Sequence, residues 1–251
     1  MDPSPRFALI ISDIAGCLGP ESAAPMHAAA LAEIAAHNEL ARARRDRPVL
    51  TVCSGRPQPY AEAMCRFLAN DMAPCICENG VWIYEPRGNL YLRDPAIAAE
   101  HLAAVHEATL WLEAELIPKG IVIQPGKTAS ISLWHPDTDL LMGQMPRLTD
   151  EFAKRAWPFR VSRTVAWINL DLEHVSKGSG IRRLKERTGL DTPRLAGIGD
   201  MPGDLAIREH VAWFACPSNA DPAIKAASDY ISPLPEVEGV RDILRVIDGM
   251  R

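Results

Sequence analysis

The sequence contains no long apolar run and no excess of positive charge. No hydrophobic stretch approaches the roughly 20 residues of a membrane-spanning helix, and no basic segment with an apolar core opens the chain. The net charge of -5 argues against nucleic acid or an anionic membrane as the main partner. Internal repeats and low-complexity segments are also absent. We therefore expect a cytoplasmic globular protein, whose oligomeric state the sequence does not indicate.

The sequence also lacks the clusters that build disulfide frameworks and zinc sites. Its seven histidines are scattered, and Cys75-Ile-Cys77 has no second Cys or His pair at zinc-ligand spacing. The six cysteines lie mostly inside apolar runs, which predicts buried, reduced thiols that pack as small hydrophobic residues. These cysteines are Cys17, Cys53, Cys65, Cys75, Cys77 and Cys216.

The chain is organised around residues 7–18, in which Asp13 follows an apolar run. Five apolar residues, 7–11, come directly before Ser12 and Asp13, and Gly16 follows shortly after. Such a run predicts a strand that is buried on both faces of a parallel sheet. Its last polar side chain then lies at the carboxyl edge of the sheet, where open α/β folds hold their ligands. A buried carboxylate needs a cation or hydrogen-bond donors, so Asp13 is the first candidate for function.

Strands and helices alternate in the two outer thirds of the sequence but not in the middle third. There, helix–strand–strand occurs twice, which is the signature of an α+β module with an antiparallel sheet. We predict an α/β fold with a doubly wound, mainly parallel Rossmann-like sheet, built from residues 1–85 and 172–251. Residues 86–171 are predicted to form an inserted α+β domain. The predicted core strands are 7–12, 48–53, 74–77, 194–199, 211–216 and 230–231, and the long helices of the insertion are 96–116 and 137–156.

Polar side chains follow the predicted core strands at the points where those strands end. Each alone has an ordinary structural explanation, such as a tight turn, a helix cap or a solvated lysine. Together, in this order, they indicate one shared site. They are Asp13, Ser54, the pair Asp200 and Asp204, and Lys177 at the start of a helix.

Phosphoryl transfer needs these residue types. Mg²⁺ takes a few carboxylate oxygens and keeps several waters, which suits Asp200 and Asp204. A hydroxyl, a lysine and backbone N–H groups must neutralise the phosphoryl oxygens, which suits Ser54 and Lys177. One carboxylate must stay free to attack phosphorus and form an aspartyl-phosphate, which suits Asp13.

The sequence resembles the haloacid dehalogenase superfamily in four motifs and in their order. Glu78-Asn79-Gly80 and Ser218-Asn219-Ala220 resemble further signatures of its Cof-type, sugar-phosphatase-like branch. That branch carries an α/β cap between its second and third motifs, which is where residues 86–171 lie. The four motifs are Asp13-Ile-Ala-Gly-Cys-Leu18, Ser54-Gly-Arg56, Ser176-Lys177-Gly178 and Gly199-Asp-Met-Pro-Gly-Asp204.

The resemblance implies a role for each motif residue. Asp13 would be the nucleophile, and Lys177 would bind both the nucleophile and the phosphoryl group. Mg²⁺ would be held by the carboxylates of Asp13, Asp200 and Asp204. The backbone carbonyl of Ala15 would be a further metal ligand. The implied phosphate-binding residues are Ser54, Gly55, Gly16 and Lys177.

One position departs from the family pattern. Phosphatases of this superfamily usually carry a second Asp two places after the nucleophile as general acid and base, and here that residue is Ala15. Residues 13 and 15 of an extended segment point the same way, so position 15 is where a proton donor would stand. The loss of a positioned acid costs ~10²–10⁴ in rate. Cys17 replaces a usual Thr, a smaller change because the backbone N–H can still bind phosphate.

Three explanations of Ala15 remain open. In the first explanation, the substrate is an acyl or enol phosphate, or another phosphorylated compound whose leaving group needs little protonation. Alternatively, the inserted domain supplies the proton, with His135, Lys127 and Asp137 as candidate donors. In the third explanation, the site binds a phosphorylated ligand and turns it over poorly. The candidate substrate-contacting residues are Arg56, Lys127, Thr128, Trp134 and His135.

The Asp-x-Ala-Gly pattern of residues 13–16 also resembles phosphonoacetaldehyde hydrolases. Those enzymes break a carbon–phosphorus bond with a Schiff-base lysine from a cap that follows the first motif directly. This chain has no lysine before Lys119. We therefore rank a hydrolase of carbon–phosphorus bonds below a phosphatase.

We expect a Mg²⁺-dependent phosphatase of a small phosphorylated metabolite, such as a sugar or sugar-acid phosphate. It would act through an aspartyl-phosphate and would be slow or restricted to good leaving groups because of Ala15. The alternative is a phosphometabolite-binding or regulatory protein with little turnover. The retained Asp13 argues against that alternative, since a pure binder does not need a free nucleophile.

Overall fold

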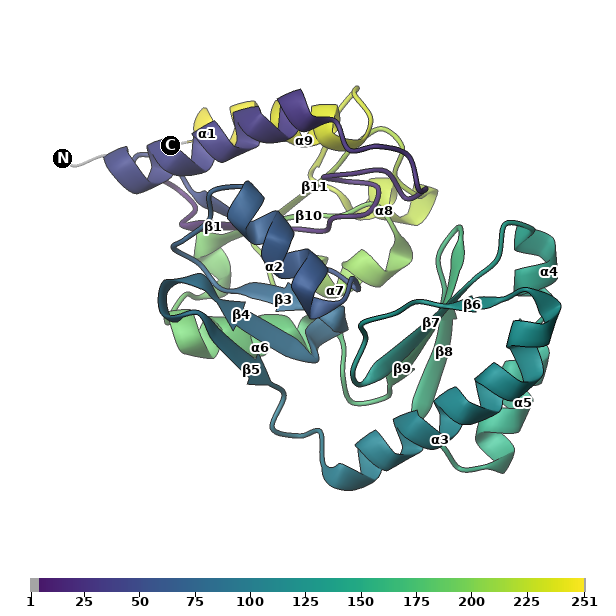
Figure 1. Ribbon diagram of the computed structural model, residues 1–251. Helices are drawn as coiled ribbons and strands as arrows, with labels where there is room; N and C mark the ends of the chain where they lie inside the picture. Colours follow the sequence, from purple (N-terminus) through teal and green to yellow (C-terminus); the bar gives the residue numbers. More distant parts are fainter. Residues whose placement is uncertain (1–4, 251) are drawn as a thin grey trace.

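A five-stranded parallel sheet forms the centre of the core in the computed structural model, which describes residues 5–250 (Figure 1). Residues 1–4 and Arg251, which the sequence assigns to the core, lie outside the described residues. The strand order is β12-β11-β10-β1-β2, so β1 lies between β10 and β2. The strands are β1 (Leu9–Ser12), β2 (Val49–Val52), β10 (Leu195–Ile198), β11 (Trp213–Cys216) and β12 (Tyr230–Ile231).

Alternate residues of β1 pack into separate hydrophobic layers on the two faces of this sheet. Ile10 belongs to the layer that α1, α2 and α9 cover, whereas Leu9 and Ile11 belong to the layer under α6, α7 and α8. Because both faces are buried, the strand is apolar throughout rather than alternating. The predicted doubly wound α/β fold is thus confirmed. The helices are α1 (Ala28–Arg44), α2 (Gln58–Phe67), α6 (Lys177–Thr188), α7 (Leu205–Arg208), α8 (Pro222–Ala227) and α9 (Glu236–Asp248).

A short antiparallel sheet continues from the end of β2. A single parallel bridge between Cys53 and Ile76 joins it to the core, and its second and third strands form a hairpin. Leu92 of this hairpin packs against the core, although its position falls inside the predicted insertion. The boundaries of that insertion, 86–171, stay a prediction. The strands are β3 (Cys75–Cys77), β4 (Trp82–Glu85) and β5 (Leu90–Arg93).

A four-stranded antiparallel sheet, the cap sheet, has the order β6-β7-β9-β8 and lies apart from the parallel sheet (Figure 1). Ile131 and Leu133 of β7 pack under the cap helices α3, α4 and α5. Ser132, between them, lines the cavity described below, so the strand alternates between an apolar and a polar face. The elements are α3 (Ala99–Leu116), β6 (Val122–Ile123), β7 (Ser130–Trp134), α4 (Thr138–Met142), α5 (Met145–Lys154), β8 (Phe159–Arg163) and β9 (Trp167–Leu172).

The single helix predicted over 137–156 is wrong, because the segment forms two helices. α4 ends at Met142, and α5 begins at Met145 with Pro146 in its first turn. Proline lacks the N–H that a continuous helix would need and favours the first turn of a new one. Gly143 lies at the break.

Short 3-10 helices connect several of these elements. They are η1 (Glu78–Gly80), η2 (Pro86–Gly88), η3 (Ile117–Lys119), η4 (Thr192–Arg194) and η5 (Pro202–Asp204). All six cysteines are buried and free. Within residues 5–250, no helix combines the length and the apolar content that crossing a bilayer requires.

Candidate active site

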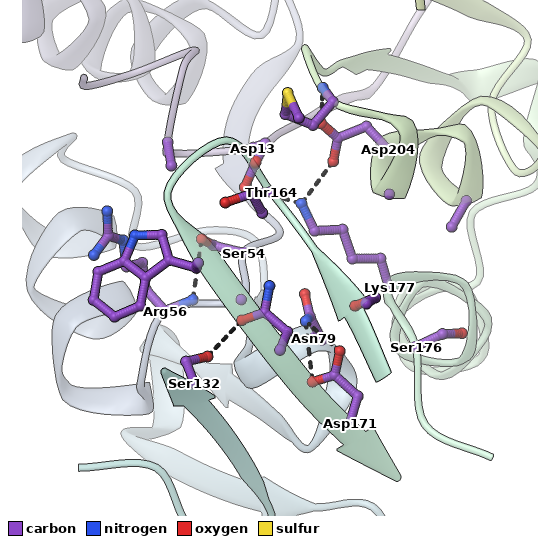
Figure 2. A pocket seen from close by; sticks show the side chains of 18 of the residues that line it. Asp13, Ser54, Arg56, Asn79, Ser132, Thr164, Asp171, Ser176, Lys177 and Asp204 are labelled. Carbon is purple, nitrogen blue, oxygen red and sulfur yellow. Dashed lines mark hydrogen bonds and ion pairs between the residues drawn. The ribbon is translucent and has the colours of Figure 1, made fainter. Parts of the chain in front are cut away.

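The predicted motif residues meet at one edge of the parallel sheet (Figure 2). Asp13 directly follows β1, Ser54 follows the neighbouring β2, and Asp200 follows β10 on the other side. Lys177 is the first residue of α6, whose N-terminus is capped by Ser176. Because β1 is central, the side chains that follow its two neighbours converge on Asp13.

Lys177 bridges two carboxylates. Its Nζ lies 3.0 Å from Asp13 Oδ1 and 2.6 Å from Asp204 Oδ1. Burial alone would lower the pKa of Lys177, but the charges of Asp13 and Asp204 raise that pKa well above its usual range. The lysine is therefore a fixed positive charge beside the candidate nucleophile.

Three buried carboxylates, Asp13, Asp200 and Asp204, place oxygen atoms within 4.8 Å of one another. Desolvation, together with the neighbouring carboxylates, raises the pKa of Asp13 to about 6 and that of Asp200 to about 9. The ion pair with Lys177 lacks hydrogen-bond geometry at Asp13 Oδ1, and no described donor satisfies this buried oxygen. Mg²⁺ binds hard oxygen donors and is stabilised by negative charge, so this group of carboxylates suits the ion. Asp13, Asp200 and Asp204 would hold it.

Asp204 also shapes the loop that carries Asp200. Its Oδ2 accepts hydrogen bonds from the backbone N–H groups of Asp200, at 2.9 Å, and of Met201, at 3.1 Å. Its Oδ1 accepts the bond from Lys177. Asp204 therefore positions Asp200 and Lys177 in addition to contributing negative charge.

Gly16 allows the loop after β1 to approach Asp200. Its φ is +77°, and a Cβ at this position would lie 1.9 Å from Asp200 Oδ2. The carbonyl oxygen of Gly16 accepts a hydrogen bond from Asn219 Nδ2 at 2.9 Å, which gives the Ser218-Asn219-Ala220 motif a structural role. Cys17 donates its thiol toward Asp200 Oδ1 at 3.6 Å.

A cavity of about 520 Å³ lies between this sheet edge and the polar face of the cap sheet. Asp13, Lys177 and Asp204 line it from the core side, together with three further predicted residues, Ala15, Ser54 and Gly55. The volume falls within the range of about 300–1,000 Å³ that is usual for metabolite pockets.

The predicted substrate-contacting residues divide into two groups. Arg56 and Lys127 line the cavity, whereas Thr128, Trp134 and His135 are not among its lining residues. The His135 ring instead bonds the backbone of Asp137, which caps α4. Lys127 is thus the one predicted proton donor that faces the cavity.

Sequence reasoning missed the contacts that hold the cap sheet against the core. Thr164 Oγ1, in the loop between β8 and β9, donates a hydrogen bond of 2.6 Å to Glu21 Oε1, and both residues line the cavity. Asn79 Nδ2 donates to both oxygens of Asp171 at the end of β9. Pairs so distant in sequence give no local signal that would link them.

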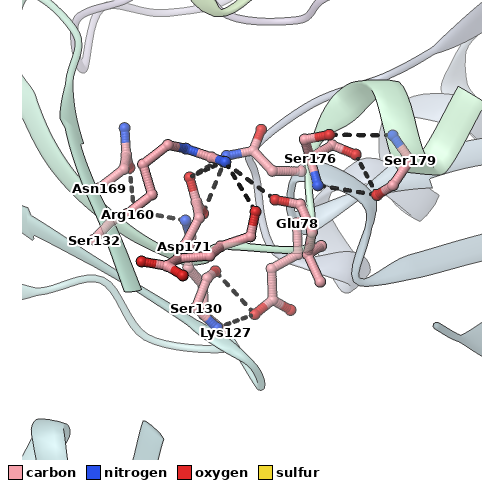
Figure 3. Close-up of polar contacts among 12 residues, drawn as sticks. Glu78, Lys127, Ser130, Ser132, Arg160, Asn169, Asp171, Ser176 and Ser179 are labelled. Carbon is pink, nitrogen blue, oxygen red and sulfur yellow. Dashed lines mark hydrogen bonds and ion pairs between the residues drawn. The ribbon is translucent and has the colours of Figure 1, made fainter. Parts of the chain in front are cut away.

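Glu78 is the largest of these connections (Figure 3). Its side chain is fully buried, and Oε1 accepts hydrogen bonds from the backbone N–H groups of Thr128, Ala129 and Ser130 at 2.7–3.0 Å. The hydroxyls of Thr128 and Ser130 donate to the same carboxylate. The predicted Glu78-Asn79-Gly80 motif thus fixes the segment that enters β7.

Replacement of Glu78 by alanine is expected to lower the free energy of unfolding by about 3 kcal/mol. The change leaves three backbone N–H groups without their acceptor in a buried place. Urea unfolding followed by circular dichroism measures the loss. Glu113→Ala, at an exposed position on α3, is the matched control and should change stability by less than about 0.5 kcal/mol. Equal stabilities of the two variants would contradict the anchoring role of Glu78.

The chain matches known proteins both in sequence and in structure. A model of the haloacid dehalogenase-like hydrolases matches residues 145–244. Over 84 residues, the chain is 38% identical to a phosphoglycolate phosphatase of Methanothrix thermoacetophila. That segment covers 34% of this chain and 36% of the relative, so the match spans only about a third of that protein's length.

Solved structures resemble the chain over nearly its whole length. Thermoplasma acidophilum protein 0175 matches with a TM-score of 0.74 and 20% identity, covering 97% of this chain and 99% of that one. A HAD/COF-like hydrolase of Plasmodium vivax matches with a TM-score of 0.71 and 13% identity, covering 95% and 97% of the two chains. At such identities the likeness concerns the fold. Over residues 145–244 the chain is therefore similar to the haloacid dehalogenase-like hydrolases, and nearly its whole length shares the fold of these two solved structures.

Proposed function

We propose that the protein is a Mg²⁺-dependent phosphatase of a small phosphorylated metabolite. The observation that carries this proposal is the grouping of Asp13, Lys177 and Asp204 at the floor of one cavity, with the buried carboxylate of Asp200 beside them. The curated relative named phosphoglycolate phosphatase supports a small phosphorylated acid as substrate. A sugar or sugar-acid phosphate would also fit the volume of the cavity.

In the proposed reaction, a carboxylate oxygen of Asp13 attacks phosphorus while the bond to the leaving-group oxygen breaks. Lys177 compensates the charge of the attacking carboxylate and of the phosphoryl oxygens, assisted by the Ser54 hydroxyl. Mg²⁺, when bound, supplies further positive charge beside the transferred group. Water then cleaves the aspartyl-phosphate and releases inorganic phosphate. Departure of an alkoxide needs a proton, and Ala15 cannot donate one.

A phosphometabolite-binding protein is the second candidate, and Ala15 is the observation that favours it. The residue lines the cavity but carries no acid, so nothing at this position can protonate a poor leaving group. The retained ion pair between Lys177 and Asp13 instead supports turnover. Release of phosphate from a panel of phosphoesters with Mg²⁺ separates the two candidates, since a pure binder releases none.

Mg²⁺ binding is expected to raise the melting temperature by on the order of 5 °C at saturation, because the ion binds the folded state. Differential scanning fluorimetry with a Mg²⁺ titration measures this shift without any assay of turnover. Asp200→Asn removes one candidate ligand and should remove most of the shift. Asp150→Asn, at an exposed position on α5, should keep it. A shift that is equal in both variants would contradict the proposed metal site.

A further inference from the structure

Most acidic side chains that line the cavity come from the core, and most basic ones come from the cap sheet and the loops beside it. The core wall is mainly acidic, with Asp13, Glu21, Asp204 and Glu209. The cap sheet and the turn that precedes it contribute Lys127, Arg160 and Arg163, and Arg56 joins them from the loop after β2. A ligand that spans the cavity therefore meets a cationic surface at the end opposite the candidate metal site.

Three of these cations have no carboxylate partner among the described residues: Lys127 and Arg56, which are partly buried, and Arg163, which is exposed. Lys177 lies between Asp13 and Asp204, and Arg160 lies 3.9 Å from Asp171. Over residues 5–250, by contrast, no carboxylate oxygen comes within 4.0 Å of Lys127 or Arg56. Both groups line the cavity and are partly buried, which is costly for a charge without a counter-ion.

Lys127 is held at the start of a polar chain on the cap sheet. Its Nζ donates to Ser132 Oγ at 2.5 Å, and Ser132 Oγ in turn donates to Asn169 Oδ1 at 2.5 Å. The amide nitrogen of Asn169 points away from Ser132 and donates to no acceptor among the described residues (Figure 3). Desolvation lowers the pKa of Lys127, against the opposing charges of Asp171 and Glu78, and a ligand anion would relieve that cost.

Arg56 is held by aromatic rings instead of by acids. Its guanidinium lies 5.3 Å from the ring centre of Tyr60 and 5.7 Å from that of Trp167, which belongs to β9. Stacking fixes the plane of the group and leaves its N–H donors available to an anion. The backbone N–H of Arg56 donates to Ser54 Oγ, so the residue connects the candidate phosphate site to the cap sheet.

We propose that Lys127 and Arg56, with the Asn169 amide, bind a second anionic group of the substrate. The substrate would then be a phosphomonoester that carries a carboxylate or a second phosphate at its other end. This inference rests on the proposed phosphatase function, because it assumes that the ester phosphate lies beside Asp13. A cavity of about 520 Å³ has room for a carbon chain between the two anions.

Matched pairs of esters test the proposal. 3-Phosphoglycerate and glycerol 3-phosphate differ by a carboxylate against a hydroxymethyl group, and glucose 1,6-bisphosphate and glucose 6-phosphate differ by a second phosphate. We expect kcat/KM to favour the anionic member of at least one pair by about tenfold or more. The pair that shows the preference identifies the second anion. Equal kcat/KM values within both pairs would overturn the proposal and leave the phosphatase function standing.

Variants assign the preference to these residues. Lys127→Met and Arg56→Met should each reduce the ratio of kcat/KM between the paired esters by about tenfold. Lys154→Met, at an exposed position on α5, is the matched control and should keep the ratio. An unchanged ratio in both cavity variants would overturn the assignment.

Calorimetry separates this proposal from the phosphatase function. The Asp13→Asn variant lacks the candidate nucleophile and should not turn the esters over. Titration of this variant with the same esters, in the presence of Mg²⁺, therefore measures binding alone. Tighter binding of the anionic ester, lost in the double variant with Lys127→Met, supports the second-anion site even if wild type releases no phosphate. Equal affinities for the paired esters would contradict it.

Discussion

Asp13→Asn is expected to lower kcat for phosphate release by on the order of 10⁴, which corresponds to about 5 kcal/mol of transition-state stabilisation. Asparagine keeps the shape of the side chain but not its charge, so it cannot form the aspartyl-phosphate. Phosphate release from the ester panel under saturating Mg²⁺ measures the loss. The same variant should fail to incorporate phosphate from labelled substrate into protein.

Loss of folding must be separated from loss of chemistry in this test. Asp13 is buried and pairs with Lys177, which keeps its bond to Asp204 in the variant, so we expect the fold to survive. Thermal unfolding of Asp13→Asn against the exposed-site control Asp150→Asn checks this. Residual rates equal to those of wild type in a folded variant would contradict the nucleophilic role and favour the binding function.

Ala15→Asp is expected to raise kcat/KM for alkyl phosphates by about 10², within the range that a positioned acid contributes. Residue 15 lines the cavity two places after Asp13, so a carboxyl group there would face the leaving group. The leaving group of 4-nitrophenyl phosphate departs without protonation. For this ester we therefore expect kcat/KM to change by less than about threefold. The measurement is the ratio of kcat/KM between glycerol 3-phosphate and 4-nitrophenyl phosphate.

Ala15→Asn is the matched control, because asparagine has the size of aspartate and no acid. It should leave the ratio at the wild-type value, so only the aspartate variant gains on the poor leaving group. The gain should also depend on pH, since the aspartate must take up a proton from solvent between turnovers. If both variants give the same ratio, the missing acid does not limit this protein.

The convergence of the core residues follows from patterns that are local in sequence. Asp13 and Ser54 each follow a short apolar run, and neighbouring parallel strands bring such ends to one edge. Their spatial grouping therefore appears in the structure as the sequence predicts. Their catalytic roles stay predictions until the variants above are measured.

The cap sheet was less predictable, because its orientation depends on distant pairs. Which side chains of this sheet face the cavity depends on how Glu78 binds the segment 128–130, some fifty positions further along the chain. Side chains on a strand alternate between faces, so a small error in phase exchanges the residues that line a cavity. No local sequence pattern in this segment indicates which set of alternating residues faces the cavity.

The pairing of β1 has a consequence for the order of events during synthesis. Ser12 lies beside Ile198, so one of the two neighbours of the central strand is synthesised long after the strand itself. The cap sheet and its helices, residues 99–172, form one contiguous stretch and can assemble earlier. Asp13 and Asp200 meet only once β10 docks. A chain that ends before β10 therefore lacks Asp200 and Asp204, although it contains the whole cap sheet.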